Sequence, residues 1–397
     1  MNAVGVQLHP PKRYKNVGTY TMKFSVDRDV LADAVTWTAR TLPSRPPSPV
    51  LAGVRIVAEP GQVRLSSFDY EVSAQQEFAA QVETPGIVLV LGKLLADIAR
   101  SLPNAPVDFE LQDRTLHVVC GPARFALQTM PVDEYPTLPA LPALAGSVDS
   151  DELAQAVGQV AVAASRDETL PLLTGIRMEI SGSTISLLST DRYRLALREL
   201  AWTPSSESMN TVALVKAKTL TDFTKTLSSG AGQVEVHLAD EQAAGLIGFS
   251  TGGRQTTSQL VDGDYPEVRR LFPESSPIYA TVRTGGLIEA VKRVALVAER
   301  NTPIRLAFTE GQVVLDAGQG DDAQASETLM ASLVGEDITV AFNPQFLIDG
   351  LTALSAEFVR MSFTHPTKPV EFTGQDTLTG EDSHQFRYLL VPIRYAG

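Results

Sequence analysis

The 397-residue chain has a single cysteine, no long apolar run and fewer cations than anions. With Cys120 alone, a disulfide framework and a cysteine-based zinc site are both excluded, and a reducing cytoplasm is the expected location. No apolar run reaches the ~18 residues that a membrane-spanning helix needs. Lys and Arg total 33 against 46 Asp and Glu, so the formal net charge is −13. This balance argues against a protein that holds nucleic acid on an exposed basic surface.

Signatures of common catalytic and cofactor sites are also missing from the sequence. It has no Walker loop, no dinucleotide-binding glycine pattern and no nucleophile elbow. Its five histidines lie far apart without metal-ligand spacing, and His117 and His237 fall in strand-like alternation. Asp321 and Asp322 are adjacent, but their Gly, Gln and Ala neighbours supply no further carboxylate for two-metal chemistry. We therefore predict no metal, no cofactor and no catalytic residue, and we expect a solvated loop at the acidic pair.

The first 21 residues differ in composition from the rest of the chain. They carry Lys12, Arg13 and Lys15 among Pro, Gly and Asn, without the apolar core of a signal peptide. A second possible start, Met22, stands directly before an alternating stretch at 23–26. We interpret residues 1–21 as a disordered extension or an over-called start, and a basic arm that touches DNA is the alternative.

What the sequence does contain is a long internal repeat in three copies. The pattern Leu-x-x-Ala-Val occurs at 31–35, 153–157 and 287–291, and Leu-x-Asp-x-x-x-x-Leu occurs at 95–102, 220–227 and 347–354. Asp97, Asp222 and Asp349 thus occupy one position in three copies. Because a catalytic site brings different residues together, we interpret these aspartates as having a repeated structural or electrostatic role.

The repeat divides the chain into three domains of one fold class. Proline-rich stretches at 136–142 and 266–277 serve as linkers, which predicts domains at 22–143, 144–275 and 276–397. Within each domain, short strands with period-2 alternation outnumber two amphipathic helices. The order is β-α-β-β-β twice per domain, so we predict an α+β fold with antiparallel sheets backed by helices.

Several segments resemble one known family, the bacterial sliding clamp, which is the β subunit of DNA polymerase III. The resemblance is carried by 189–195 (STDRYRL), 260–266 (LVDGDYP) and the end of the chain at 388–394. Segments 67–72 and 293–300 are similar to actinobacterial members in particular. The resemblance extends from Met22 to the last residue. It implies three DNA-clamp domains per chain and two chains that close head to tail into a ring, with helices lining the hole and sheets outside.

The resemblance also implies a function and a set of partners. The chain would be a non-catalytic subunit of a DNA-directed DNA polymerase, a processivity factor that encircles double-stranded DNA without sequence preference. As a cytoplasmic homodimer it would tether the replicative polymerase α subunit, the clamp loader, other polymerases and repair proteins through short apolar motifs. Groove-binding natural-product peptides are a further class of ligand, and no membrane contact is expected.

The family's partner groove lies between domains two and three, and its residues carry over to this sequence one by one. The predicted groove comprises Leu173, Thr190, Arg192, Tyr193, Arg194, Leu195, Pro266, Arg270, Leu271, Phe346, Leu389, Leu390, Val391, Pro392, Ile393 and Arg394. Most of these residues are apolar, and any single one of them, such as Leu390 or Ile393, could equally be ordinary core.

Helix periodicity agrees with a DNA-facing side on the second helix of the first and second domains. Lys93, Asp97 and Arg100 fall on one side of their helix, and Leu94, Leu95 and Ile98 on the other. Together with the resemblance, this predicts DNA-facing cations at Arg45, Lys93, Arg100, Arg166, Lys218 and Lys225. The third domain offers Gln345, Asp349 and Thr352 instead, so DNA contact is expected to be biased toward domains one and two.

The ring interface would join the first domain of one chain to the third domain of the next. The resemblance places Phe125 and Leu127 against Leu296 and Val297, with Arg124 near Glu327. Two readings from other classes remain open beside the clamp. One is a metal-dependent nuclease built of three duplicated domains, and the other is a monomeric scaffold that binds peptides only.

Overall fold

The structure is a computed structural model that describes residues 21–227, 230, 232–238, 245–298, 302–318 and 324–394. The predictions for residues 1–20 and for Asp321 and Asp322 lie outside these residues. Residue 21 was included in the predicted extension, but Thr21 begins the first strand and pairs with Gln112. Two compact units divide the described residues, 21–70 with 74–138 and 71–73 with 139–394. The second unit holds the predicted domains two and three.

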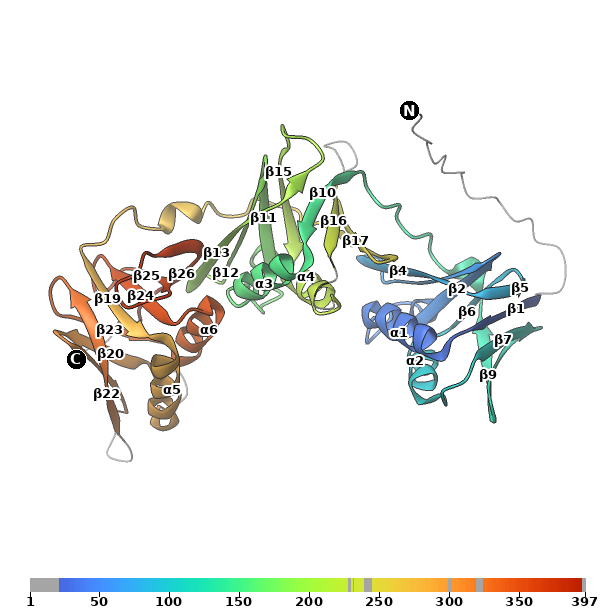
Figure 1. Ribbon diagram of the computed structural model, residues 1–397, viewed down its shortest axis with the longest axis horizontal. Coiled ribbons are helices and arrows are strands. Elements are labelled where there is room, and N and C mark those ends of the chain that lie inside the picture. The colour runs from blue at the N-terminus through green and yellow to red at the C-terminus, as the bar shows by residue number, and fades with distance from the viewer. Residues whose placement is uncertain are drawn as a thin grey trace. The chain divides into compact units, whose positions relative to one another are not determined.

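The first domain follows the predicted order of β-α-β-β-β twice, with one extra short strand (Figure 1). Its elements are β1 (Thr21–Val26), α1 (Arg28–Thr38), β2 (Gly53–Glu59), β3 (Gln62–Phe68), β4 (Val72–Ala79), β5 (Gln81–Thr84), β6 (Gly86–Leu91), α2 (Gly92–Ser101), β7 (Val107–Gln112), β8 (Thr115–Cys120) and β9 (Ala123–Met130). Short 3-10 turns lie at Ala39–Thr41 (η1), Pro49–Ala52 (η2) and Val132–Glu134 (η3).

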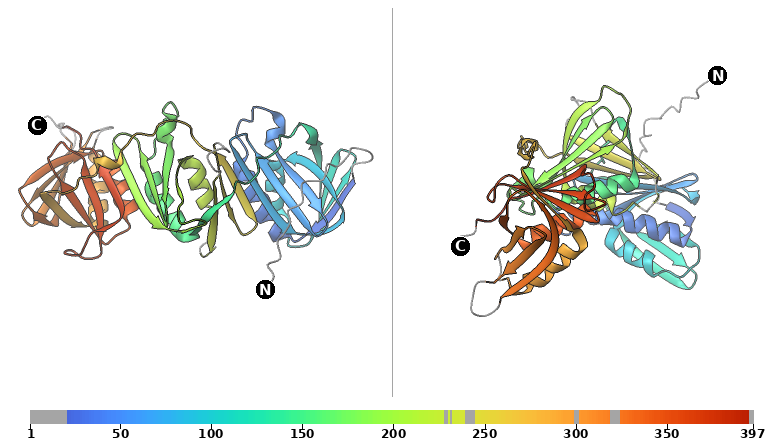
Figure 2. Two further views of the ribbon diagram at one scale, coloured as in Figure 1. Left: turned by 90° about the horizontal axis from the view of Figure 1, so that it is seen from above. Right: turned by 60° about the vertical axis from the view of Figure 1, so that its left-hand side comes forward.

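Antiparallel strands of the first unit run in the order β3-β2-β6-β9-β8-β7-β1-β5. The helices α1 and α2 lie side by side against one face, as both Figure 1 and Figure 2 show. Alternate residues of β7 are buried beneath them, and the Phe24 and Phe109 rings stack with centroids 4.5 Å apart. Helix α1 begins where the Asp27 carboxylate accepts the backbone N–H of Asp29.

The second domain repeats the same order within the second unit. Its elements are β10 (Leu144–Asp149), α3 (Ser150–Ala161), η4 (Pro171–Thr174), β11 (Gly175–Ser181), β12 (Thr184–Thr190), β13 (Arg194–Ala201), β14 (Thr203–Pro204), β15 (Asn210–Lys216), α4 (Ala217–Thr224), β16 (Gln233–Leu238), β17 (Leu246–Thr251), β18 (Arg254–Gln259) and η5 (Arg269–Leu271). Counterparts in the first two domains lie 122 residues apart at β2 and β11, and the turns that follow β3 and β12 share a left-handed residue, Tyr70 (φ 75°) and Arg192 (φ 81°).

The third domain completes the repeat. It consists of β19 (Ile278–Arg283), α5 (Thr284–Val294), η6 (Ala295–Val297), β20 (Ile304–Thr309), β21 (Gln312–Ala317), β22 (Ala325–Val334), β23 (Ile338–Phe342), α6 (Pro344–Leu354), β24 (Phe358–Phe363), β25 (Val370–Gln375) and β26 (Ser383–Leu390). The predicted fold class is therefore confirmed, because helices and antiparallel sheets alternate in the predicted order three times.

A single sheet runs through the second and third domains. Its order is β15-β11-β12-β13-β26-β25-β24-β19-β22-β21-β20-β23, and β13 pairs with β26 in the middle. The helices α3 and α6 meet behind this junction, where the Gln159 side chain donates a 2.9 Å hydrogen bond to the carbonyl of Ala353. Because the main apolar core also extends across both domains, they pack as one body.

Two glycines in helices provide a matched test of this packing. A methyl group on Gly350 of α6 would overlap the ring of Tyr388, whereas one on Gly158 of α3 would meet open space. We expect Gly350→Ala to destabilise the second unit by about 1–3 kcal/mol through overpacking. Gly158→Ala should stabilise it by up to about 1 kcal/mol, because alanine is the better helix former. Denaturant unfolding measures both changes, and equal midpoints would contradict the packing described.

Candidate partner surface and DNA-facing helices

The predicted groove residues come together where β13 pairs with β26. Arg194 lies opposite Leu390 and Leu195 opposite Leu389 in this antiparallel pair. Beyond the strand end, the N–H of Val391 donates a 2.9 Å hydrogen bond to the carbonyl of Tyr193. Two segments nearly 200 residues apart in sequence are therefore held in a fixed register, and this junction presents side chains of both domains on one surface.

These residues form a buried apolar floor and an exposed apolar layer. Leu173, Leu195 and Leu389 share a small buried cluster with Tyr265 and Phe272. The exposed layer has four large apolar side chains, with exposed fractions of 57% for Tyr193, 52% for Leu271, 37% for Val391 and 38% for Ile393. We call this set, with its floor, the partner surface. Exposed apolar groups that gather over a buried apolar cluster are typical of a binding site.

The remaining predicted groove residues divide between core and rim. Leu390 is 1% exposed and belongs to the main core, so its side chain faces away from the partner surface. Pro392 and Thr190 are also buried. The charged members Arg192, Arg270 and Arg394 are exposed, and so is Pro266.

The turn that carries Tyr193 is fixed by its own polar groups. The Thr190 hydroxyl donates a 2.6 Å hydrogen bond to the carbonyl of Arg194 and accepts the N–H of Arg192 at 3.1 Å. The Asp191 carboxylate accepts the N–H groups of Tyr193 and Arg194, both at 3.0 Å. These bonds hold Arg192 in the left-handed region (φ 81°), so the exposed tyrosine projects from a rigid turn.

Arg194 lies buried behind this turn and joins the two domains through charge. Its side chain is 7% exposed, with Nε 2.9 Å from Asp191 Oδ2 and Nη1 2.7 Å from Asp349 Oδ2 of α6. The guanidinium carbon also lies 4.2 Å from the centroid of the Phe346 ring. Burial by itself lowers the pKa of Arg194, but Tyr388, Asp349 and Asp191 outweigh it and the pKa is raised. The arginine therefore stays charged and acts as a structural anchor of the partner surface.

Three neighbours complete this anchor. Gln345 donates a 2.7 Å hydrogen bond to the second oxygen of Asp349, and the Tyr388 hydroxyl donates one of 2.9 Å to the carbonyl of Phe346. The Phe346 ring packs beside Tyr193 with centroids 6.3 Å apart. Sequence reasoning did not assign Asp191, Gln345, Asp349 and Tyr388 to the site, although Asp191 and Tyr388 stand inside the segments that carried the family resemblance. Asp349 was visible only as the third copy of the repeated aspartate.

The six predicted DNA-facing cations are all exposed. Lys93 and Arg100 lie on α2, Lys218 lies on α4, and Lys225, Arg166 and Arg45 follow α4, α3 and η1. Leu94 was predicted on the buried side of α2, but it is 45% exposed, because the buried stripe of this helix is formed by Leu95, Ile98 and Ala99.

The repeated aspartate neutralises a cation in each copy. Asp97 pairs with Arg100 three residues along α2, and Asp222 Oδ2 lies 2.5 Å from Lys218 Nζ on α4. In the third copy, Asp349 instead turns to Arg194 at the domain junction. These pairs agree with the electrostatic role that the repeat suggested. The corresponding helix of the third domain, α6, contains no Lys or Arg.

Two strand edges lie at the positions predicted for the ring interface. In the part of the chain that the structure describes, residues 123–128 of β9 pair only with β8, and residues 325–330 of β22 pair only with β21. Leu296 and Met330 are 83% and 89% exposed. Arg124 is exposed and Phe125 and Val297 are half-buried, whereas Leu127 is 3% exposed and packs in its own domain's core.

Glu327, the predicted partner of Arg124 across the interface, already has a partner within the chain. Both its carboxylate oxygens accept hydrogen bonds from Arg293 of α5, at 2.6 and 2.9 Å. This hydrogen bonding lowers the pKa of Glu327 and raises that of Arg293. A contact with Arg124 would therefore add to an existing pair at an exposed position, where such pairs contribute little.

The described residues show no arrangement suited to metal chemistry. They contain no group of three or more His, Cys, Asp or Glu side chains that could hold a metal ion. His237 is buried and satisfied, with its ring nitrogens 3.1 Å from the Pro142 carbonyl and 2.9 Å from the Ser250 hydroxyl. Nor does any described helix have the length and apolar character needed to cross a membrane.

Three copies of a domain that runs β-α-β-β-β twice are the architecture of the DNA clamps. Comparisons with known proteins narrow this class. The family models of the DNA polymerase III beta subunit match with the N-terminal domain at residues 22–139, the central domain at 147–267 and the C-terminal domain at 269–394. The chain therefore belongs to the DNA polymerase III beta subunit family, the bacterial sliding clamps.

Several similar proteins are beta sliding clamps. The chain is 52% identical to the beta sliding clamp of Streptomyces coelicolor, over 95% of this chain and 100% of the relative. It is 58% identical to that of Micrococcus luteus, over 79% of this chain and 100% of the relative. A structure of the Pseudomonas aeruginosa sliding clamp bound to griselimycin is 26% identical with a TM-score of 0.87, and the match covers 94% of this chain and 100% of that one. The chain is thus an actinobacterial-type clamp, a non-catalytic processivity subunit of DNA polymerase III.

The buried anchor can be tested through Asp349. In Asp349→Asn, Arg194 keeps Asp191 as its only carboxylate partner, and the loss of a buried charge-assisted bond costs about 1.5–3 kcal/mol. We expect hydrogen exchange to accelerate by tenfold or more at the amides of residues 191–194 and 389–391. Asp222→Asn, which removes an exposed pair on α4, is the matched control and should leave these amides unchanged. Equal exchange in wild type and Asp349→Asn would contradict the anchoring role.

Proposed function

We propose that two copies of this chain close head to tail around duplex DNA, and that the partner surface of each copy tethers polymerases and other replication or repair proteins in the cytoplasm. The observation that carries this proposal is the partner surface itself, with four exposed apolar side chains over a buried leucine floor. The ends of β13 and β26 and the Arg194 anchor hold it rigid. A pre-formed surface of this kind suits a short apolar motif from many different partners.

The size of the partner surface sets the expected affinity. Two or three apolar side chains of a partner would each contribute about 1.5–3 kcal/mol on burial, less the cost of ordering the peptide. The net value is at most about 8 kcal/mol, which corresponds to dissociation constants that are micromolar or weaker. Binding of that strength exchanges quickly, so several partners can share one clamp in turn. The replicative polymerase α subunit, the clamp loader, other polymerases and repair proteins are the partners that we propose.

Natural-product peptides are a second class of ligand for the partner surface. The sliding clamp of Pseudomonas aeruginosa has been observed with griselimycin. We propose that peptides of this type bind here at Tyr193, Leu271, Val391 and Ile393, because these exposed apolar groups would be buried by the same contacts that a protein motif makes.

Contacts with DNA are proposed to be weak and independent of sequence. The exposed cations Arg45, Lys93, Arg166 and Lys225 would meet phosphates, together with Arg100 and Lys218. Those last two are already paired with Asp97 and Asp222, so each must break an ion pair before it reaches a phosphate. Retention would then depend on enclosure rather than on affinity, which suits movement along the duplex.

The ring interface is proposed to pair the free edge of β9 with the free edge of β22 of a second copy. Unpaired edges expose backbone donors and acceptors, and another strand can satisfy them. Phe125 with Leu296, Val297 and Met330 would supply the apolar part of the interface. Leu127 would support the interface from within its own domain.

The partner surface is tested by Ile393→Asp, which places a charge on its exposed layer. We expect polymerase stimulation to fall by at least tenfold, because the partner motif would have to bury an unpaired carboxylate. Leu378→Asp is the matched control, since Leu378 is similarly exposed (46%) but lies outside the predicted groove. Both variants should remain dimeric by light scattering. Full stimulation by Ile393→Asp would remove the assignment of the partner surface.

Topological binding is tested by loading the protein onto nicked circular DNA and then cutting the circle. A closed ring stays on the circle and slides off the linear product. Leu296→Asp should weaken ring closure and reduce retention on the circle, because it places a charge on the apolar interface. Equal retention of wild-type protein on circular and linear DNA would contradict the mechanism, and a monomer at micromolar concentration would contradict the ring.

A further inference from the structure

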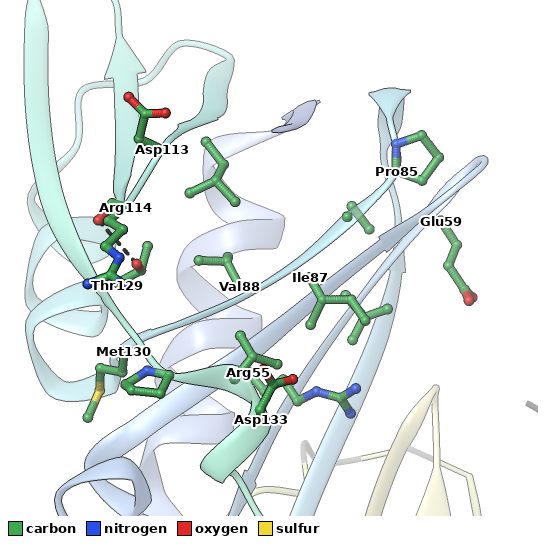
Figure 3. A pocket seen from close by; sticks show the side chains of 16 residues that line it. Arg55, Glu59, Pro85, Ile87, Val88, Asp113, Arg114, Thr129, Met130 and Asp133 are labelled. Atoms are coloured by element: carbon green, nitrogen blue, oxygen red, sulfur yellow. Dashed lines mark hydrogen bonds between the residues drawn. The ribbon is translucent and has the colours of Figure 1, made fainter. Parts of the chain in front are cut away.

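A cavity of about 710 Å³ lies in the first domain, and none of its lining residues belongs to the partner surface or to the DNA-facing cations. It occupies the place where β9 separates from β6. These strands pair only at Leu89 with Met130 and at Val90 with Thr129. Residues 131–133 follow β9 and line the cavity. The opening between residues 85–88, residues 129–133 and the turn at 113–114 forms the cavity (Figure 3). Its volume falls in the range of small-ligand pockets.

The walls of the cavity are apolar with a few charged groups. The lining residues are Arg55, Val57, Ala58, Glu59, Pro85, Gly86, Ile87, Val88, Leu111, Asp113, Arg114, Thr129, Met130, Pro131, Val132 and Asp133. Carboxylates at Glu59, Asp113 and Asp133 outnumber the two arginines. A ligand with several negative charges is therefore disfavoured in this cavity, and a single carboxylate is favoured only directly beside an arginine.

Arg55 is the unusual group in the lining. It comes from β2 and is half-buried, yet its side chain makes no hydrogen bond or ion pair with any other described residue. Burial lowers the pKa of its guanidinium, nearby Arg64 lowers it further, and Tyr135 offsets only part of this effect. Buried or half-buried charges normally have a partner, because desolvation without one costs free energy. The cavity thus contains a cation that no described carboxylate pairs with, and Tyr135 is the described neighbour that favours its charge.

The second domain shows what this position looks like with a partner. Arg177, 122 residues along, is the counterpart of Arg55, and its Nε lies 2.7 Å from Oε1 of Glu179. The residue that corresponds to Glu179 in the first domain is Val57. The same strand position therefore holds a carboxylate in one repeat and an apolar wall in the other. What the first domain lacks at this point is one carboxylate.

We propose that this cavity binds a ligand that joins one carboxylate to a compact apolar group. The carboxylate would take the place of Glu179 and receive the planar fork of the Arg55 guanidinium. The apolar group would pack on Val57, Ile87 and Met130. An acidic side chain within an apolar peptide and a free carboxylic acid share this chemistry. All lining residues lie in the first domain. The proposal of this site therefore does not depend on ring closure or on the partner surface.

The test uses the methionine methyl groups of the full-length protein in NMR. The chain has seven methionines, and Met130 lines the cavity, so its methyl resonance, assigned through Met130→Leu, reports on binding. Two probes carry the carboxylate, 3-phenylpropionate and the peptide N-acetyl-Leu-Glu-Phe-amide. Their neutral controls are 3-phenylpropionamide and the peptide with Gln in place of Glu. We expect a saturable shift of Met130 with at least one acid, and at least tenfold weaker binding of its neutral control.

Two variants and one control locate the carboxylate. Arg55→Gln should weaken acid binding by tenfold or more, and Val57→Glu should do the same by supplying an internal carboxylate, as in the second domain. Arg177→Gln should leave binding unchanged. Tighter binding of the peptide indicates a protein partner, and tighter binding of the free acid indicates a small molecule. The proposal is overturned if Met130 shows no saturable shift up to about 10 mM, a range that still detects fragment-strength binding. It is also overturned if acids and neutral controls bind alike, or if both cavity variants bind like wild type.

Discussion

The partner surface depends on one buried cation, Arg194. A guanidinium that is 7% exposed would be strongly unfavourable alone, and it is tolerated because Asp191 and Asp349 accept its hydrogen bonds from two different domains. Those same bonds fix the turn before β13 and the start of α6, which carry Tyr193 and Phe346. The ion pairs of Arg194 thus fix the shape of the partner surface rather than contact a partner directly. They place apolar side chains from distant parts of the sequence on one rigid surface.

Much of the fold follows from the sequence because each element has a local cause. The repeated Leu-x-x-Ala-Val patterns bury one face of α1, α3 and α5, and period-2 alternation produces strands such as β7. Leu94 shows the limit of such patterns. Its helix is short, and a stripe of Leu95, Ile98 and Ala99 already fills the space beneath it, so a neighbouring leucine stays exposed. Hydrophobic periodicity indicates which side of a helix is buried, but the packing beneath the helix decides how many residues that buried side includes.

The site was accessible to sequence reasoning only in part. Family resemblance indicated the segments that meet at β13 and β26, since those segments carry recognisable residues. It did not separate Leu390, which faces the core, from Leu389, which faces the floor, because a strand alternates its sides and the register depends on its partner. Nor could the sequence show that Asp349 pairs with Arg194 of another domain, whereas Asp97 and Asp222 each pair with a cation on or beside their own helix. That change depends on where Arg194 lies in three dimensions.

The ion pairs on α2 and α4 have a kinetic consequence. On the proposed mode of binding, a phosphate that approached Arg100 or Lys218 would have to compete with a carboxylate on the same helix. Each of these two contacts with the duplex would then gain little free energy and end soon. Successive phosphates would present small free-energy differences at these positions, and the resistance to movement along the duplex would be low. Asp97 and Asp222 would thus ease the movement of the clamp along DNA, although an acidic protein at first seems unsuited to binding a polyanion.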